Sequence, residues 1–320
     1  MANTTFETYG TVGIREDLAD IIYNIAPTDT PFISNVGKGS ASGTYHEWQT
    51  DDLSAATDNK VNEGVAAPAA ESSATARVGN YTQIASKTVS VSGSNEVADA
   101  AGRSSQMAYQ LAKKGMELKR DMEKTLVGTD KAQSAGVAAG GSQAPRELGS
   151  VTSWIGTNCS VGATTGAVPT GDGTDIATSG DARPLTDTLL NGVIEDIWQA
   201  GGNPSMIMCG AFQKSKITGF EGNTNTARKF TDAESKKFIN AVDVYVSDYG
   251  ELNVVPNRLM LTDTLLVLQP DMWSVDTYRD FQTKDLAVTG DFESKQLLVE
   301  YTLCSKNEAA SGAIRDLTTA

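Results

Sequence analysis

The sequence predicts an α+β fold, because helix-like and strand-like patterns occupy different stretches of the chain. Three observations lead to this class. Residues 95–127 contain no proline and repeat small or apolar side chains at alternating spacings of four and three, as on one face of a helix. Residues 44–49 and 81–91 alternate as strands do, and residues 184–268 mix short helix and strand patterns.

The composition describes an acidic chain of 320 residues with a formal net charge of -14. This length allows two compact units. The negative charge argues against a protein sheath laid directly on nucleic acid, which needs clustered Lys and Arg. A membrane-spanning helix needs a run of about 18 apolar residues, and the sequence contains no such run. The first residues also lack the pattern of a signal peptide. Three distant cysteines without a Cys-x-x-Cys pair favour synthesis in a reducing cytoplasm: Cys159, Cys209 and Cys304.

The first 43 residues are expected to form short helical turns. Residues 14–25 carry an apolar stripe that predicts a helix ending before Pro27, because proline disfavours helix in the preceding residue. Thr30 then caps a second turn that has Pro31 at its first position. The glycine-rich stretch 37–43 is interpreted as a flexible bend.

Two predicted strands, 44–49 and 81–91, flank a segment of a different kind. Residues 51–80 are rich in Ala, Ser, Asn and Asp and show no sustained apolar period. Thirty structureless residues are improbable inside a compact domain. The segment is therefore interpreted as an extended hairpin arm that becomes ordered on a neighbouring subunit, with a disordered surface loop as the alternative.

The helix predicted over 95–127 is the longest element. Ser94 is expected to cap its start and Gly128 to end it. Its length would be roughly 50 Å at about 1.5 Å per residue. The apolar stripe is thin, so we interpret this helix as a rod lying across a sheet, with a coiled coil as the alternative.

The remaining chain predicts one mixed unit and a return to the first sheet. Residues 151–155 are expected to be a strand of the first unit. Residues 297–304 are apolar on both faces for part of their length, which is typical of a central strand, and residues 307–317 are expected to complete the same sheet. The mixed unit comprises helices 186–200 and 211–219 and strands 205–209, 242–247, 252–255 and 265–268, with a polar stretch at 221–237.

Sequence patterns for catalysis and cofactor binding are missing. A Ser-His-Asp or Cys-His site would have to use His46, the only histidine, and no Gly-x-Ser-x-Gly elbow occurs. One histidine and three scattered cysteines cannot supply the usual zinc ligand set. No phosphate-binding glycine loop is present, and Asp172, Asp175 and Asp181 lack the spacing of a calcium-binding EF-hand. We therefore predict no enzyme activity, no metal and no cofactor.

Two motifs near the N-terminus resemble a known family. Residues 24–32 read Asn-Ile-Ala-Pro-Thr-Asp-Thr-Pro-Phe, and residues 46–51 read His-Glu-Trp-Gln-x-Asp. This pair resembles the N-terminal arm of tailed-bacteriophage major capsid proteins, most closely those of several podophages and siphophages. The later order of elements is similar as well. The resemblance implies the capsid fold shared with encapsulins and herpesviruses, divided into an N-terminal arm (1–43), an extended hairpin loop (44–91, tip 51–80), a peripheral domain with the spine helix (92–183), an axial domain (184–268) and a return to the peripheral domain (269–320).

The resemblance also implies a function and partners. Copies would form hexamers and pentamers of an icosahedral head, assembled in the host bacterial cytoplasm around double-stranded DNA that is contacted non-specifically. A portal, a separate scaffold protein and a decoration protein are the other expected partners, and no membrane is expected. The alternatives are an encapsulin-like compartment shell and, further away, a soluble α/β enzyme.

The expected contacts between subunits lie in the N-terminal arm and the hairpin. Some capsid proteins of this fold crosslink through a Lys of the arm; Lys60 lies there, but a matching Asn and Glu are not found, so no crosslink is expected. Only about forty residues precede the first strand, so the N-terminus is expected to be retained. The expected contact residues are Pro27, Pro31, Phe32, His46, Trp48, Asp51, Leu53, Lys60, Val61 and Val65.

Overall fold

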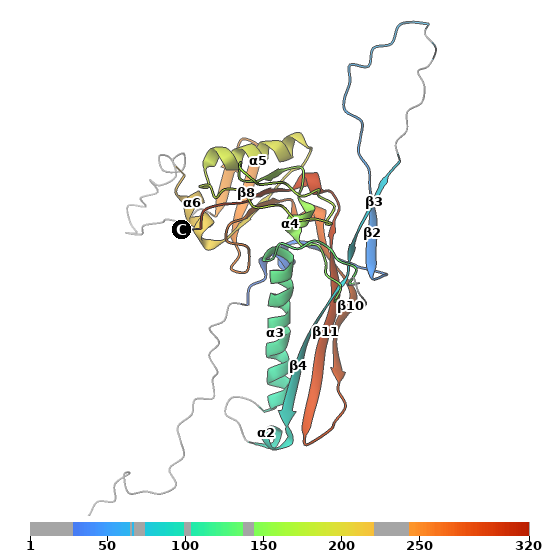
Figure 1. Ribbon diagram of the computed structural model, residues 1–320, viewed down its shortest axis with the longest axis vertical. Helices are drawn as coiled ribbons and strands as arrows, with labels where there is room; N and C mark the ends of the chain where they lie inside the picture. Colours follow the sequence, from blue (N-terminus) through green and yellow to red (C-terminus); the bar gives the residue numbers. More distant parts are fainter. Residues whose placement is uncertain are drawn as a thin grey trace, which may run out of the picture.

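The computed structural model describes residues 28–64, 66, 74–98, 104–136, 144–220 and 243–319. Helices and strands alternate irregularly along the chain, as expected for an α+β protein (Figure 1). In chain order they are α1 (Pro31–Asn35), β1 (Gly37–Ser40), β2 (Tyr45–Thr50), β3 (Ala76–Tyr81), β4 (Gln83–Ser92), α2 (Gly93–Val97), α3 (Gln106–Val127), α4 (Val151–Trp154), β5 (Cys159–Ser160), α5 (Asp187–Gln199), β6 (Met206–Cys209), α6 (Ala211–Thr218), β7 (Val244–Ser247), β8 (Gly250–Pro256), β9 (Leu265–Leu268), η2 (Pro270–Met272), β10 (Trp273–Asp285), β11 (Phe292–Ser305), η3 (Glu308–Ala310) and β12 (Gly312–Ile314).

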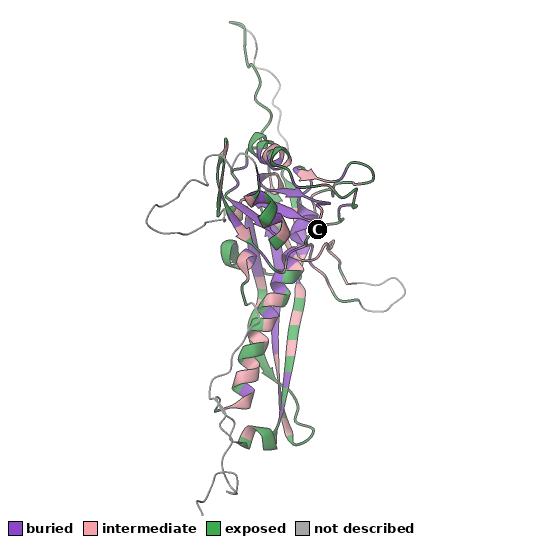
Figure 2. Cartoon of the chain, turned by 90° about the vertical axis from the view of Figure 1, so that its left-hand side faces the viewer, coloured by how far each residue is buried: buried purple, intermediate pink, exposed green. Residues whose placement is uncertain are grey.

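A four-stranded sheet with α3 laid along it forms the long part of the molecule (Figure 1). Its strand order is β1-β10-β11-β4, and β11 is central, as predicted for residues 297–304. The buried stripe of α3 includes Leu118, Met122 and Leu126, which share a core with Val299 of β11. Figure 2 shows buried residues concentrated toward the wide end of the molecule, while the far ends of α3 and β11 are only half-covered.

A six-stranded sheet, ordered β5-β12-β9-β6-β8-β7, forms the second unit. Leu190, Val193, Ile194 and Ile197 on α5 are all buried, which confirms the predicted apolar stripe. Thr186 accepts the Leu189 N–H and caps this helix. The structure places β12 in this sheet, beside β9, and so corrects the expectation that residues 307–317 complete the first sheet.

The third sheet is the two-stranded hairpin of β2 and β3, which projects from the rest of the chain (Figure 1). Its antiparallel register runs from Tyr45 opposite Tyr81 to Thr50 opposite Ala76. The strand predicted at 44–49 is therefore present with a shift of one residue. The strand predicted at 81–91 is divided, because Tyr81 ends β3 and the following residues form β4.

The long helix predicted over 95–127 is wrong in its first part. Its described portions are the short α2 and the 22-residue α3, which spans about 33 Å. The cap is Ser105 rather than Ser94: its side chain accepts the Ala108 N–H at 3.2 Å, and the Glu96 carboxylate accepts the Met107 N–H at 3.0 Å. These two acceptors satisfy N–H groups that only a helix start leaves free, so α3 begins at Gln106.

Other local predictions are corrected. Residues 151–154 form a buried single turn of helix, α4, instead of a strand. The glycine-rich stretch predicted to be a bend contains β1, which pairs in parallel with β10. The strand predicted at 242–247 is present as β7 in its described part, with Val244 and Val246 exposed and Tyr245 packed on the core. Strand β10 was not predicted.

Several predictions fall outside the described residues: the helix at 14–25, Pro27, Val65 and the polar stretch 221–237. Within the described helices, none combines the length and the hydropathy of a membrane-crossing segment.

Candidate assembly site

The base of the hairpin is fixed to the first sheet. We call this base the arm root and define it as residues 44–48 and 78–82. Asn80 is fully buried there. Its amide group donates to the Leu303 carbonyl oxygen at 2.9 Å, and its side-chain oxygen accepts the Gly149 N–H at 2.9 Å. The Thr302 hydroxyl donates to the Tyr81 carbonyl oxygen at 3.0 Å. Buried polar groups stabilise a structure only when they are paired in this way, so the arm root has one defined position on β11.

Glu300 of β11 is the buried charge to which the arm root is attached, and it is only 1% exposed. Its Oε1 accepts hydrogen bonds from the Thr82 hydroxyl at 2.7 Å and from Arg146 Nη2 at 2.6 Å. Its Oε2 accepts from Arg279 Nε, also at 2.6 Å. Two guanidinium groups thus compensate one buried carboxylate. The cluster joins β10, β11, the segment before α4 and Thr82, which lies between β3 and β4.

His46 belongs to β2, the first strand of the hairpin. Its Nε2 is 3.0 Å from Asp276 Oδ2, and the Cys304 sulfur belongs to the same group of side chains. Burial raises the pKa of the Cys304 thiol to about 11, so without a further partner the thiol is neutral. Gly39 of β1 passes directly over the carboxylate: a Cβ at this position would stand 2.3 Å from Asp276 Oδ1. Only glycine lets β1 approach that closely.

Trp48 connects the arm root to the core. Its ring centroid is 5.3 Å from that of Trp154 and 5.8 Å from that of His46. Trp154 is 1% exposed and belongs to the main core. Aromatic pairs at such distances stabilise by about 0.5–1.5 kcal/mol beyond the area they bury. The α4 turn presents Trp154 at this position.

The beginning of the described chain is fixed to α3 by a buried carboxylate. Glu123 accepts the N–H groups of Phe32 at 2.8 Å and Ile33 at 3.0 Å, and the amide of Asn257 at 2.7 Å. Thr30 occupies the cap position of α1 without a side-chain hydrogen bond, so Glu123 takes over that role from a distant element. Burial is the main cause that raises the pKa of Glu123, and the three hydrogen bonds oppose it.

The arm beyond its root is exposed. Residues 51–64 have no helix or strand structure, and every one of them is exposed. Leu53 is 99% exposed and Val61 62% exposed. The hydrogen bonds found among these residues are local, such as Lys60 N–H to the Asp58 carbonyl oxygen at 3.0 Å. This segment leaves its main chain and its apolar side chains available to another molecule.

The residues expected at subunit interfaces therefore divide into four groups. Phe32 is enclosed by its own chain at 0% exposure. His46 and Trp48 are half-buried and contact their own chain, and Pro31 is half-buried. Pro27 and Val65 lie outside the described residues. The residues that remain exposed on the arm are Asp51, Leu53, Lys60 and Val61.

Sequence reasoning missed the buried polar partners of the arm root. One signal was present: Glu300 stands within the mainly apolar run 297–304, and a buried carboxylate requires cationic partners. Its partners could not be found from spacing, because Arg146 is 154 residues away in sequence.

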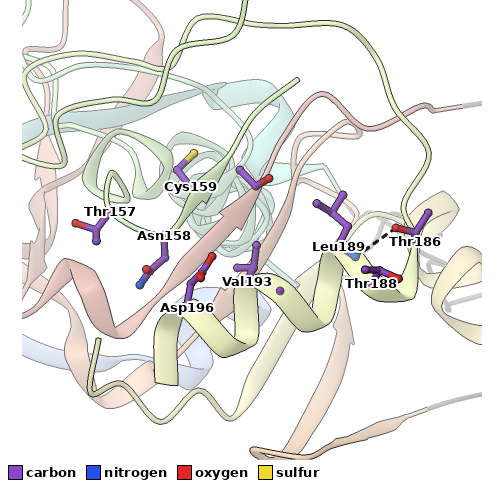
Figure 3. Close-up of a pocket in the computed structure, with 10 residues that line it drawn as sticks. Thr157, Asn158, Cys159, Thr186, Thr188, Leu189, Val193 and Asp196 are labelled. Carbon is purple, nitrogen blue, oxygen red and sulfur yellow. Dashed lines mark hydrogen bonds between the residues drawn. The ribbon is translucent and has the colours of Figure 1, made fainter. Parts of the chain in front are cut away.

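A cavity of about 430 Å³ lies between α5 and the start of β5 (Figure 3). Cys159 and Asp196 line it together with threonine side chains. Burial raises the pKa of Cys159 to about 11, which makes this thiol a poor nucleophile at neutral pH. The histidine of the chain is at the arm root, so no Cys-His pair is formed here, and the cavity does not have the groups of a hydrolase site.

The model of the SU10 major capsid protein family matches residues 2–318. The chain belongs to this family.

Individual relatives agree with the family. The major capsid protein of Escherichia phage Phieco32 is 29% identical over 352 residues, with 98% of this chain and 97% of that protein covered. In the capsid asymmetric unit of cyanophage A-1(L), one chain has a TM-score of 0.68 at 12% identity, covering 96% of this chain and 98% of that one. A chain in the phage G structure of gp27 major capsid proteins and gp26 decoration proteins has a TM-score of 0.55 at 10% identity, with 100% and 99% covered.

Membership confirms the resemblance noted in the two N-terminal motifs. The protein is a phage major capsid protein and a component of the virion capsid, and its α+β fold is that of tailed-phage capsid proteins. The encapsulin alternative is not favoured, because the matched family and the relatives named above are phage capsid proteins. The family is named for a structural role in the capsid, not for a reaction.

Proposed function

We propose that copies of this chain form the hexamers and pentamers of an icosahedral phage head, and that the arm at residues 51–80 reaches a neighbouring copy. The observation that supports this is the contrast within one hairpin: a root held by buried polar groups, and a tip whose described residues 51–64, 66 and 74–77 are all exposed. A rigid root aims the tip in one direction. The tip then gains main-chain and apolar contacts on the neighbour that its own chain does not offer.

The other parts of the chain have roles in the same assembly. The six-stranded unit would converge on the capsomer axis, and α3 with the four-stranded sheet would form the shell wall. We propose the domain division 1–43, 44–91, 92–183, 184–268 and 269–320, with β12 crossing to the axial sheet. Modest contacts repeated around closed symmetry would make the shell cooperative.

The partners follow from the charge and the role. Encapsulated double-stranded DNA would be contacted weakly and non-specifically by scattered Lys and Arg, because a net charge of -14 disfavours close association with a polyanion. A portal, a separate scaffold protein and a decoration protein would complete the head, and assembly would take place in the host bacterial cytoplasm. The protein itself would perform no catalysis.

The test is deletion of residues 55–75, with the two ends joined by a short Gly-Ser linker. We expect a folded subunit by circular dichroism and no particles by negative-stain microscopy, whether the protein is expressed alone or with its scaffold. The matched control replaces the same residues by a Gly-Ser stretch of equal length, which separates the loss of reach from the loss of side chains. Normal particles from the deletion variant would refute the role of the arm. A full-length protein that stays monomeric under all these conditions would refute the shell.

A further inference from the structure

Three potential metal ligands from distant parts of the chain meet at the arm root. One ligand atom from each of His46, Asp276 and Cys304 lies within 4.8 Å of the other two. They come from β2, β10 and β11, so the hairpin supplies one ligand and the sheet supplies two. Among the described residues, this is the group of three such side chains that is close enough to hold one ion. Sequence reasoning excluded a zinc set because the cysteines are scattered, but the fold brings one of them to the only histidine.

The carboxylate in this group is incompletely satisfied. Asp276 is 5% exposed, and its Oδ1 has no hydrogen-bond partner. Its Oδ2 has one partner, His46, whose imidazole compensates the negative charge only when it carries a proton. A buried carboxylate with a single partner of this kind is costly. A divalent cation between the three side chains would compensate the charge fully.

The chemistry of the donors selects the class of cation. One nitrogen, one oxygen and one sulfur atom suit zinc and similar transition metals, whereas calcium and magnesium prefer oxygen ligands alone. The imidazole side chain is 19% exposed, so solvent and a dissolved cation can reach this group. Cys304 of β11 pairs with Ser274 in the ladder, two residues before Asp276, so two of the three donors lie on neighbouring strands.

We propose that His46, Asp276 and Cys304 bind one zinc-class divalent cation that ties the base of the hairpin to the four-stranded sheet. Binding replaces the thiol proton of Cys304 by the metal, and the proton leaves to solvent. The cation would stabilise the arm root against movement relative to β10 and β11. This binding is a property of the single subunit, so its test does not depend on assembly.

The test uses cobalt(II) as the probe, added to the metal-free full-length subunit under reducing conditions. We expect one cobalt ion per chain and a sulfur-to-cobalt charge-transfer band, because the proposed site contains a thiolate. We also expect the metal-free protein to show a higher thermal midpoint after zinc is added. A wild-type protein that shows no such band at saturating cobalt would overturn the proposal. His46 and Asp276 would then form an ion pair only.

Variants locate the site. Cys304→Ser should abolish the charge-transfer band and lower the affinity for cobalt by roughly 10–100-fold or more, and His46→Gln should lower the affinity by a similar factor. The matched control is Cys209→Ala, which removes a buried cysteine of the six-stranded sheet and should keep the band. Circular dichroism shows whether each variant is folded. A band that survives in folded Cys304→Ser and disappears in folded Cys209→Ala would place the metal elsewhere and refute the assignment.

Discussion

The root and the tip of the hairpin differ in the kind of side chain that is buried and the kind that is exposed. At the arm root, polar side chains such as Asn80 and Glu300 are buried and paired with partners more than 150 residues away. At the tip, Leu53 and Val61 are apolar and exposed. Burial of polar groups fixes a single geometry, whereas exposed apolar groups become stabilising only after another surface covers them. The root therefore belongs to the folding of one subunit, and the tip belongs to association.

The largest loss of stability is expected for Glu300→Ala, beneath the arm root. Removal of the carboxylate leaves Arg146, Arg279 and the Thr82 hydroxyl without their shared acceptor in a buried place. Breaking a buried ion pair from one side costs about 3–5 kcal/mol. Since both arginine side chains keep partial access to water, at 27% and 34%, we expect a value near the lower end of that range. Urea unfolding of the isolated subunit measures it.

The matched control for this change is Glu293→Ala on the same strand. Glu293 is also paired with a cation, Lys295, but its side chain is 55% exposed. An exposed pair contributes little, so we expect less than about 1 kcal/mol. Equal losses in the two variants would mean that burial does not distinguish the arm root from the rest of β11.

The elements of this fold were visible in the sequence where a pattern is local. The stripe of α5 and the apolar runs of β6, β9 and β11 were predicted because spacing alone defines them. Strand β10 was overlooked although Trp273, Val275 and Thr277 alternate with polar residues, because its buried half carries Ser274 and Asp276 as well. The α4 turn could not be predicted, since its strand-forming residues are held in a helical turn by complete burial on all sides.

The candidate site was less predictable than the fold. His46 and Trp48 were singled out from a motif, but their partners Asp276, Cys304 and Trp154 are separated from them by more than 100 residues. No local spacing encodes such a meeting. Only the pairing of β10 with β11, and the placement of β2 above them, brings these groups together.

The segment at Phe32 and Ile33 is also held by a buried carboxylate, Glu123, and here the stability should depend on pH. Glu123→Gln keeps the shape of the side chain but turns an N–H donor toward backbone N–H groups that need an acceptor. We expect a loss of about 1–3 kcal/mol. Because burial raises the pKa of Glu123 in the folded state above its ordinary value of 4.5, the folded state holds its proton to higher pH than the unfolded state. Stability from this group is then fully present below pH 4.5 and declines as the pH rises through the folded pKa.

The loss of unfolding free energy caused by Glu123→Gln should therefore decrease as the pH rises. The difference in unfolding free energy between wild type and Glu123→Gln should be larger at pH 4 than at pH 7. The measurement is urea unfolding at several pH values in one buffer series. A difference that grows with rising pH would show that the three hydrogen bonds to the carboxylate outweigh its burial.

The smallest expected effect on the subunit is at the tip, with Leu53→Ser. Leu53 is 99% exposed, so its replacement removes no buried surface, and the unfolding free energy of the subunit should change by less than about 0.5 kcal/mol. If a neighbouring copy covers this side chain, the same change removes about 1.5–3 kcal/mol from each contact between subunits. Repeated over a shell, a loss of this size should lower particle yield or raise the protein concentration needed for assembly.

The matched control is Leu286→Ser, a residue that is 38% exposed just after β10 and outside the arm. A tip variant that unfolds more easily as a subunit yet assembles normally would reverse the contrast between root and tip, because it would show that the tip serves its own chain.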